Sequence, residues 1–170
     1  MSVPPLVIMG VSGCGKTTVG QGLAERVPDS VFIDADDLHP AANVEKMRSG
    51  VPLTDVDRAP WLDAVGRAMR EASAAGRTPI VACSALKRAY RLRILAEEPD
   101  AFFVLLDVDR AELERRMRER KHHYMPASLL DSQLATLERL APDEPGTTVP
   151  IVGPGGEVVE TVLARVVDAR

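Results

Sequence analysis

Short apolar runs alternate along the chain with segments in which apolar residues recur every three or four positions. The runs predict buried strands, and the recurring spacing predicts amphipathic helices. Five strands are predicted, at 6–9, 31–33, 79–83, 102–106 and 149–152. Helices are predicted after Lys16 and at 41–48, 60–75, 90–97, 111–120, 126–140 and 157–169. This alternation predicts an α/β protein with a parallel five-stranded sheet and helices on both faces.

The segment 51–58 shows neither a helical nor a strand period. Pro60 is expected to open the helix that follows, because proline suits the first turn of a helix. A length of 170 residues is typical of one domain, so a single domain is expected over 1–170.

The connection between the first strand and the first helix reads G-x-x-x-x-G-K-T, from Gly10 to Thr17. Its glycines permit a tight loop whose backbone N–H groups surround phosphate oxygens, and the helix N-terminus adds partial positive charge. Lys16 is expected to reach the β- and γ-phosphates of a nucleotide, and the Thr17 hydroxyl to bind Mg²⁺. The alternative is a glycine-rich turn with a chance Lys-Thr, which the flanking strand and helix disfavour. The predicted phosphate-binding residues are Gly10, Val11, Ser12, Gly13, Cys14, Gly15, Lys16, Thr17 and Thr18.

Three carboxylates, Asp34, Asp36 and Asp37, follow the second predicted strand. In open α/β sheets, ligands bind outside the carboxyl ends of the strands, which is where these acids are expected. A solvated acidic turn that caps the next helix is the alternative. The neighbouring phosphate loop favours a functional site.

The predicted helix at 111–120 carries four arginines, and a polar segment, 121–125, separates it from the next helix. Such a connection late in a small phosphate-loop fold predicts a lid over ATP, at about residues 120–131, whose arginines contact the transferring phosphoryl group. Arg116 and Arg120 share one helix face, and these two are predicted to bind the phosphates of ATP. Arg115 and Arg118 are expected in solvent, and a wholly solvated face is the alternative.

Composition narrows the class of protein. The formal net charge of −4, without a basic block, argues against nucleic acid as a main partner. No apolar run is long enough to cross a membrane, and the first residues lack a secretory pattern. Only two cysteines occur, Cys14 and Cys83, which fits a reducing cytoplasm. The pair His122 and His123 is not expected to bind a metal, because no partner ligands complete such a site.

Together these residues resemble the gluconokinases of the small P-loop kinase type, relatives of shikimate kinase. The match extends to about residue 138, and the P-loop alone would indicate only an NTPase. More specific are D-A-D-D-L-H-P at 34–40, G-V-P-L-T-D-V-D-R-A-P-W-L at 50–62 and A-C-S-A-L-K-R at 82–88. Additional matching residues are Asn43, Lys46, Met47, Tyr90 and Arg91, and the segment 120–126 with Leu129, Leu130, Ser132 and Gln133 resembles the family's lid.

The resemblance implies a three-layer P-loop NTPase-type fold and ATP-dependent phosphorylation of D-gluconate at its 6-hydroxyl, in a cytoplasmic enzyme of gluconate utilization that forms a homodimer. It implies that Asp36 is the base, that Asp34 holds a water on Mg²⁺, and that Lys16 and Arg120 assist transfer. A guanidinium fork suits the gluconate carboxylate, and Arg58 is the best candidate. The further substrate-binding candidates are Lys87, Arg88, Ser84, His39 and His123.

Three alternatives remain at this stage. A kinase for another small polyol acid, such as shikimate, would share the loop but differ in the 58–62 segment. A non-catalytic nucleotide-binding module would lack the acids and the lid arginines. A polynucleotide kinase would need a basic groove, which the sequence does not show.

Overall fold

The computed structural model describes residues 2–120, 127–152 and 155–169. Its five strands form one parallel sheet in the order β2-β3-β1-β4-β5. The strands are β1 (Leu6–Met9), β2 (Ser30–Asp34), β3 (Thr78–Ala82), β4 (Phe102–Asp107) and β5 (Gly146–Pro150). The predicted parallel five-stranded sheet is therefore confirmed.

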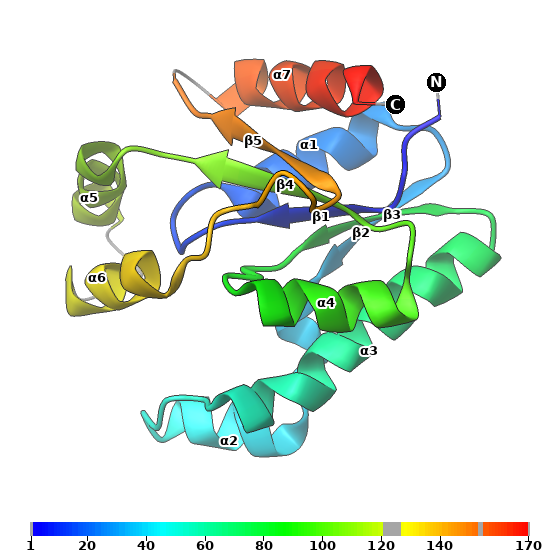
Figure 1. Ribbon diagram of the computed structural model, residues 1–170. Coiled ribbons are helices and arrows are strands. Elements are labelled where there is room, and N and C mark those ends of the chain that lie inside the picture. The colour runs from blue at the N-terminus through cyan, green and yellow to red at the C-terminus, as the bar shows by residue number, and fades with distance from the viewer. Residues whose placement is uncertain (1, 121–126, 153–154, 170) are drawn as a thin grey trace.

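Helices cover both faces of this sheet (Figure 1). On one face lie α1 (Lys16–Arg26) and α7 (Gly155–Asp168), and on the other α3 (Asp55–Ala74) and α4 (Arg88–Glu97). Successive residues of a strand point to opposite faces. In β1, Leu6 and Ile8 accordingly pack in the core with α1 and α7, whereas Val7 and Met9 pack with α3 and α4. All four are fully buried, and the predicted three-layer fold is confirmed.

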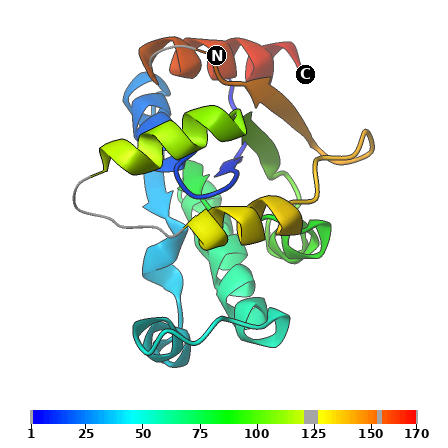
Figure 2. The same cartoon turned by 90° about the vertical axis from the view of Figure 1, so that its left-hand side faces the viewer.

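The remaining elements lie toward the carboxyl ends of the strands. They are the 3₁₀ helix η1 (Ala35–Leu38), α2 (Ala41–Arg48), α5 (Arg110–Glu119) and α6 (Ala127–Thr136). In Figure 2, α5 and α6 lie on either side of the loop that follows β1. Of the predicted lid, residues 121–126 lie outside the described residues, and the part from Ala127 begins α6. In the described part of the chain, no helix is long and apolar enough to cross a membrane.

The helix expected to begin at Pro60 begins earlier, at Asp55. A capping box fixes this start: the Asp57 N–H donates to Thr54 Oγ1 at 3.1 Å, and the Thr54 N–H donates to Asp57 Oδ2 at 2.9 Å. Two otherwise unpaired N–H groups are thus satisfied. Pro60 lies inside α3, where it removes one N–H from the helical hydrogen bonds and crowds the carbonyl one turn earlier without ending the helix. Arg58 consequently lies on the first turns of a helix rather than in an irregular loop.

Two other boundaries differ from the prediction by more than two residues. Helix α6 ends at Thr136 rather than at 140, because the Glu138 N–H leaves the helix and donates to the Leu86 carbonyl at 2.7 Å. Strand β5 begins at Gly146 rather than at 149. A Cβ at Gly146 would lie 2.5 Å from the Phe103 carbonyl oxygen, so this start of the edge strand requires glycine.

Candidate active site

The loop between β1 and α1 has the geometry of a phosphate cradle. Gly10, Gly13 and Gly15 have φ angles of 145°, 85° and 100°, in the region that favours glycine. The Lys16 ammonium donates to the carbonyl oxygens of Gly10 and Val11, both at 3.1 Å. This folds the lysine side chain back along the loop, so that its positive charge lies against the residues that follow β1.

A cleft of about 570 Å³ lies against this loop. A narrower hollow of about 190 Å³ continues from it toward the end of β3 and reaches Ser84 and Gln133. The cleft is lined by Ser12, Gly13, Gly15, Lys16, Thr17, Thr18, Asp34, Asp36, Arg116, Met117 and Arg120. The structure thus brings together most of the predicted phosphate-binding residues and two of the three acids.

The acids are positioned by the turn that follows β2. Asp34 ends the strand, and its Oδ1 accepts from the Asp36 N–H at 3.0 Å. The buried Trp61 donates its indole N–H to the Ala35 carbonyl at 2.7 Å, which fixes the turn from the other side. Asp36 is accessible from the cleft, but the surrounding protein partly desolvates its carboxyl. This desolvation, together with the nearby charge of Asp34, raises the pKa of Asp36.

Two arginines of the 111–120 region face the phosphate loop. Arg116 donates through Nη1 to the Gly13 carbonyl at 3.1 Å, and through Nε to Glu112 at 3.0 Å. Arg120 lines the same cleft just beyond α5. Arg115 instead bridges Glu112 and Glu119 on the exposed side of α5. Hydrogen bonds from Arg115 and Arg116 lower the pKa of Glu112 to about 2, so it stays ionised beside the cleft.

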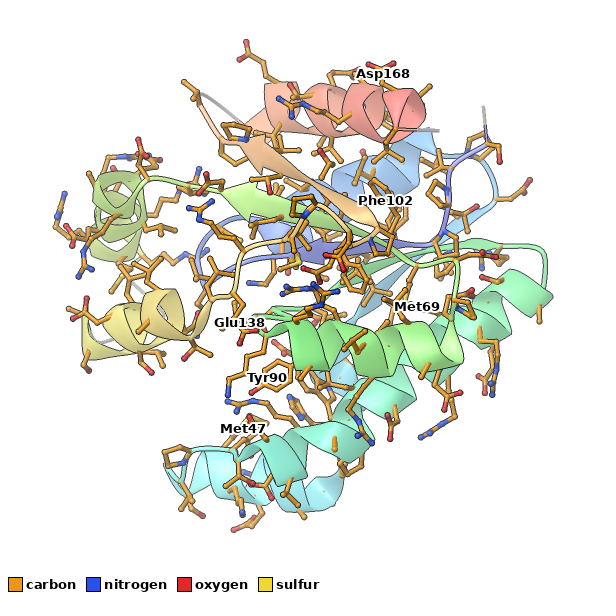
Figure 3. The ribbon with its side chains drawn as sticks, in the orientation of Figure 1. Met47, Met69, Tyr90, Phe102, Glu138 and Asp168 are labelled. Atoms are coloured by element: carbon orange, nitrogen blue, oxygen red, sulfur yellow. The ribbon has the colours of Figure 1, made fainter. Side chains whose placement is uncertain are left out.

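A second, wider cleft of about 810 Å³ adjoins the narrow hollow, and Ser84 and Gln133 line both. Met47 on α2 and Tyr90 on α4 lie on the same side of the sheet and border it (Figure 3). Arg58 contributes a guanidinium whose Nη1 donates to the Tyr90 hydroxyl at 3.3 Å. This cleft therefore offers positive charge at Arg58, and the narrow hollow connects it with the phosphate loop.

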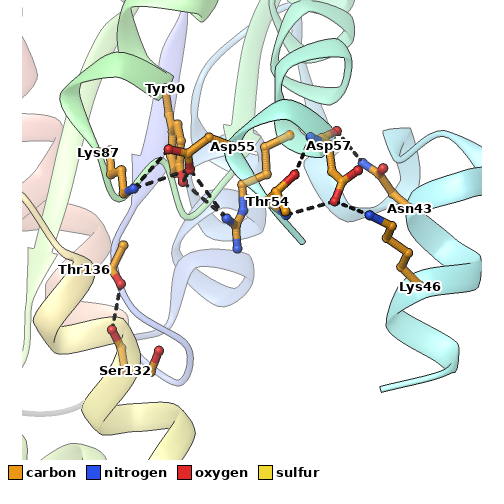
Figure 4. Close-up of polar contacts among 10 residues, drawn as sticks. Asn43, Lys46, Thr54, Asp55, Asp57, Lys87, Tyr90, Ser132 and Thr136 are labelled. Carbon is orange, nitrogen blue, oxygen red and sulfur yellow. Dashed lines mark hydrogen bonds and ion pairs between the residues drawn. The ribbon is translucent and has the colours of Figure 1, made fainter. Parts of the chain in front are cut away.

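Asp55 organises the basic end of the second cleft (Figure 4). Its carboxylate accepts from the Tyr90 hydroxyl at 2.5 Å and from the Lys87 ammonium at 3.2 Å. The Arg58 Nη1 lies 3.9 Å from it. These contacts hold the charges of Arg58 and Lys87 near the Tyr90 ring, 5.7 and 5.6 Å from its centroid. Sequence reasoning missed Asp55 and Tyr90 as partners of the cations.

Arg88 lies apart from Arg58 and Lys87. Its guanidinium forms two hydrogen bonds to the Asp143 carboxylate, at 2.9 and 2.5 Å. The neighbouring Arg91 is fully buried and pairs with Glu144 at 2.7 and 3.0 Å. Arg91 also donates to the Ala85 carbonyl at 2.9 Å, which fixes the turn after β3. Sequence reasoning did not identify this role for Arg91.

His39 lies beside the acid turn and stacks on the Trp61 ring, with centroids 4.2 Å apart. The Asn43 amide nitrogen lies 3.2 Å from its Nδ1 and can only donate, so the proton of the neutral imidazole is on Nε2. Burial lowers the pKa of His39, which keeps the ring neutral near pH 7. His123, the other histidine predicted to bind substrate, lies outside the described residues.

Both cysteines are buried, and burial raises both pKa values, that of Cys83 to about 12. The helix N-terminus next to Cys14 therefore does not produce a reactive thiolate. The sulfur of Cys14 lies 2.7 Å from the position of a Cβ at Gly10, which shows how closely the loop is packed. Close packing in the loop therefore accounts for a small residue at position 14.

The parallel sheet, the phosphate loop at its carboxyl edge and the adjoining second cleft define the class of small P-loop kinases. Comparison with known proteins agrees with this class. The profile of a family described as an AAA domain matches residues 6–140. A gluconokinase from Gluconobacter oxydans is 53% identical over 140 residues, which cover 82% of this chain and 78% of that protein.

Two solved structures extend the comparison to nearly the whole chain. A gluconokinase from Sinorhizobium meliloti superposes with a TM-score of 0.85 and is 41% identical, covering 96% of this chain and 91% of that one. A sugar kinase from a Janibacter species gives a TM-score of 0.86 at 43% identity, covering 96% and 94%. This chain belongs to the gluconokinase family, as the resemblance in its sequence predicted.

Proposed function

We propose that this protein transfers the γ-phosphoryl group of ATP to the 6-hydroxyl of D-gluconate, giving 6-phosphogluconate and ADP. The observation that carries the proposal is the continuous path between two clefts. The phosphate loop with Lys16 and Asp36 opens, past Ser84 and Gln133, into the cleft that contains Arg58. Alignment of two bound substrates and neutralisation of charge are the main requirements of phosphoryl transfer.

On the nucleotide side, the loop N–H groups and Lys16 bind the β- and γ-phosphates. Arg116 and Arg120 supply further positive charge for the transferring group. Beyond Gly13 and Gly15 lies an adjoining hollow of about 350 Å³, with apolar walls at Ile151 and Val158, that suits the nucleotide base. The phosphates and the base of ATP therefore have adjacent sites.

Oxygen donors beside the loop fit a magnesium ion, since Mg²⁺ prefers carboxylate and hydroxyl oxygens and keeps several waters. Thr17 and Asp34 line the same cleft, and we propose that they hold the ion, Thr17 through its hydroxyl and Asp34 through a water. The ion would neutralise phosphate charge.

Asp36 is proposed to orient the 6-hydroxyl and to take its proton as the bond to phosphorus forms. Its raised pKa makes it a better proton acceptor than an ordinary aspartate. Asp37 is exposed and is not among the residues that line the clefts described above. His39, with its proton on Nε2, can donate to a sugar hydroxyl.

The gluconate carboxylate is proposed to bind Arg58, with Lys87 behind it. The contacts described for Arg58 all go through Nη1, and Nε and Nη2 can form a fork to a carboxylate. Arg88 is left out of this role, because its own fork is engaged by Asp143. The carboxylate would then lie at the end of the cleft away from the phosphate loop.

A cytoplasmic location and a homodimer are also part of the proposal. The location rests on the family resemblance and on the two buried, free cysteines, which fit a reducing compartment. The homodimer rests on the family resemblance alone. Gel filtration with light scattering tests the dimer.

The activity is tested by measuring ADP release with a panel of acceptors that contains gluconate, glucose, shikimate and other polyol acids. Gluconate is expected to give the highest kcat/KM, with 6-phosphogluconate as the product detected by NMR. A higher kcat/KM for shikimate or another acid would replace the proposed acceptor. No release of ADP with any acceptor would indicate a nucleotide-binding module.

A further inference from the structure

Gln133 on α6 forms a contact that the chemistry above does not use. Its side-chain oxygen accepts a hydrogen bond from the Ser12 N–H of the phosphate loop at 2.6 Å. Backbone N–H groups of this loop are the donors that bind phosphate oxygens. The Gln133 oxygen therefore occupies the acceptor position on one N–H group of this loop.

Gln133 also lies where the two clefts meet. It lines the narrow hollow with Lys16 and Asp36, and it lines the wider cleft with Arg58. A glutamine amide carries both an acceptor oxygen and an NH₂ donor, so it can bind the hydroxyl groups of a polyol. Once released from Ser12, this amide can therefore reach an acceptor substrate.

The backbone around Gln133 is anchored at both ends, so release of the Gln133 amide from Ser12 needs only a rotation of the side chain. Arg110 on α5 forms an ion pair with Asp131, two residues before Gln133. After the helix, the Glu138 N–H donates to the Leu86 carbonyl at 2.7 Å. Side-chain rotamers change far faster than helices move.

We propose that Gln133 couples the binding of the two substrates. A phosphate of ATP takes the Ser12 N–H and displaces the Gln133 amide, which then hydrogen-bonds a hydroxyl of gluconate. This inference rests on the proposed function and adds a residue that favours gluconate binding after the nucleotide has bound. Because coupling is reciprocal, gluconate must strengthen nucleotide binding by the same factor.

Calorimetry with the full chain tests the coupling. Dissociation constants are measured for gluconate and for a β,γ-imido ATP analogue with Mg²⁺, each alone and in the presence of the other. In the wild type, each ligand is expected to tighten the other by about fivefold or more. The Gln133→Met variant keeps the side-chain length and loses the amide, so the coupling factor should fall below about twofold.

Two substitutions of Gln133 are expected to have opposite effects on nucleotide binding. In Gln133→Met the analogue alone should bind as tightly as in the wild type or more tightly, because the competing acceptor is gone. In Gln133→Glu it should bind more weakly, because a carboxylate holds the Ser12 N–H more strongly and repels phosphate. Gln21→Met makes the same exchange at an exposed position of α1 and should leave all constants unchanged.

If the hydrogen bond between Gln133 and Ser12 only stiffened the phosphate loop, the measurements would give a different result. Gln133→Met would then weaken the analogue and leave the coupling factor intact, and this outcome overturns the proposal. So does wild-type binding of the two ligands without coupling. Wild-type protein that binds the analogue but not gluconate would instead contradict the proposed function.

Discussion

Replacement of Arg58 by lysine tests how the enzyme would distinguish gluconate from glucose, which lacks the carboxylate. One charge-assisted hydrogen bond contributes about 1.5–3 kcal/mol, which is about 10- to 150-fold in kcat/KM. The Arg58 side chain is one-third exposed and its guanidinium already contacts Tyr90, so each arm of the fork is counted at the low end of this range. Wild-type protein should therefore prefer gluconate by more than about a hundredfold, counting both arms of the fork.

Arg58→Lys keeps the charge but loses one arm, so the preference should fall at least about tenfold. The assay is kcat/KM for gluconate and glucose, with folding checked by thermal unfolding. Arg88→Lys is the matched control, because its guanidinium pairs with Asp143, and it should retain the wild-type preference. Equal preference in wild type and Arg58→Lys would move the carboxylate to Lys87. A loss in Arg88→Lys as large as in Arg58→Lys would refute the placement of Arg88.

Three other substitutions, two of them with control variants, and one pH profile test the remaining assignments. Lys16→Ala should abolish most of kcat in a folded protein, and normal turnover would exclude its role in transfer. Asp36→Asn should lower kcat by about 10²–10⁴-fold, and Asp37→Asn far less, with the reverse order indicating the wrong base. The wild-type rate should fall with decreasing pH at a higher midpoint than an ordinary aspartate gives, because the pKa of Asp36 is raised. Arg91→Met should lower the free energy of unfolding in urea by about 3–5 kcal/mol, much more than Arg93→Met at an exposed pair on the same helix, and equal losses would contradict the role of burial.

Among the strands, the sequence signal was clearest where the side chains are buried on both faces of the sheet. The four residues of β1 are all fully buried, so the strand appears as an unbroken apolar run. Edge strand β5 contains one buried residue, Val149, and its pattern gave the wrong limits. The start of α3 was also detectable, because Thr54 and Asp57 have the spacing of a capping box. Pro60 gave the stronger signal and was misinterpreted.

The candidate site also has parts that the sequence predicted and parts that it did not. The phosphate loop and the acids after β2 could be placed together, because parallel strands bring their carboxyl ends to one edge. The cations could not be sorted by sequence. Arg88 and Arg91 are three residues apart on α4, but their partners Asp143 and Glu144 are more than fifty residues away. Residue type and spacing do not specify such contacts.

The buried pair of Arg91 and Glu144 connects the stability of the fold with the geometry of the reaction. Arg91 holds the Ala85 carbonyl, and the preceding Ser84 accepts from the Gly10 N–H at 3.3 Å through its own carbonyl. The turn after β3 is therefore fixed both to α4 and to the start of the phosphate loop. An apolar pair of similar size could replace a buried ion pair without loss of stability, but it could not hold a carbonyl in place. The position of this turn, which borders both clefts at Ser84, is a physical reason for a buried charge here.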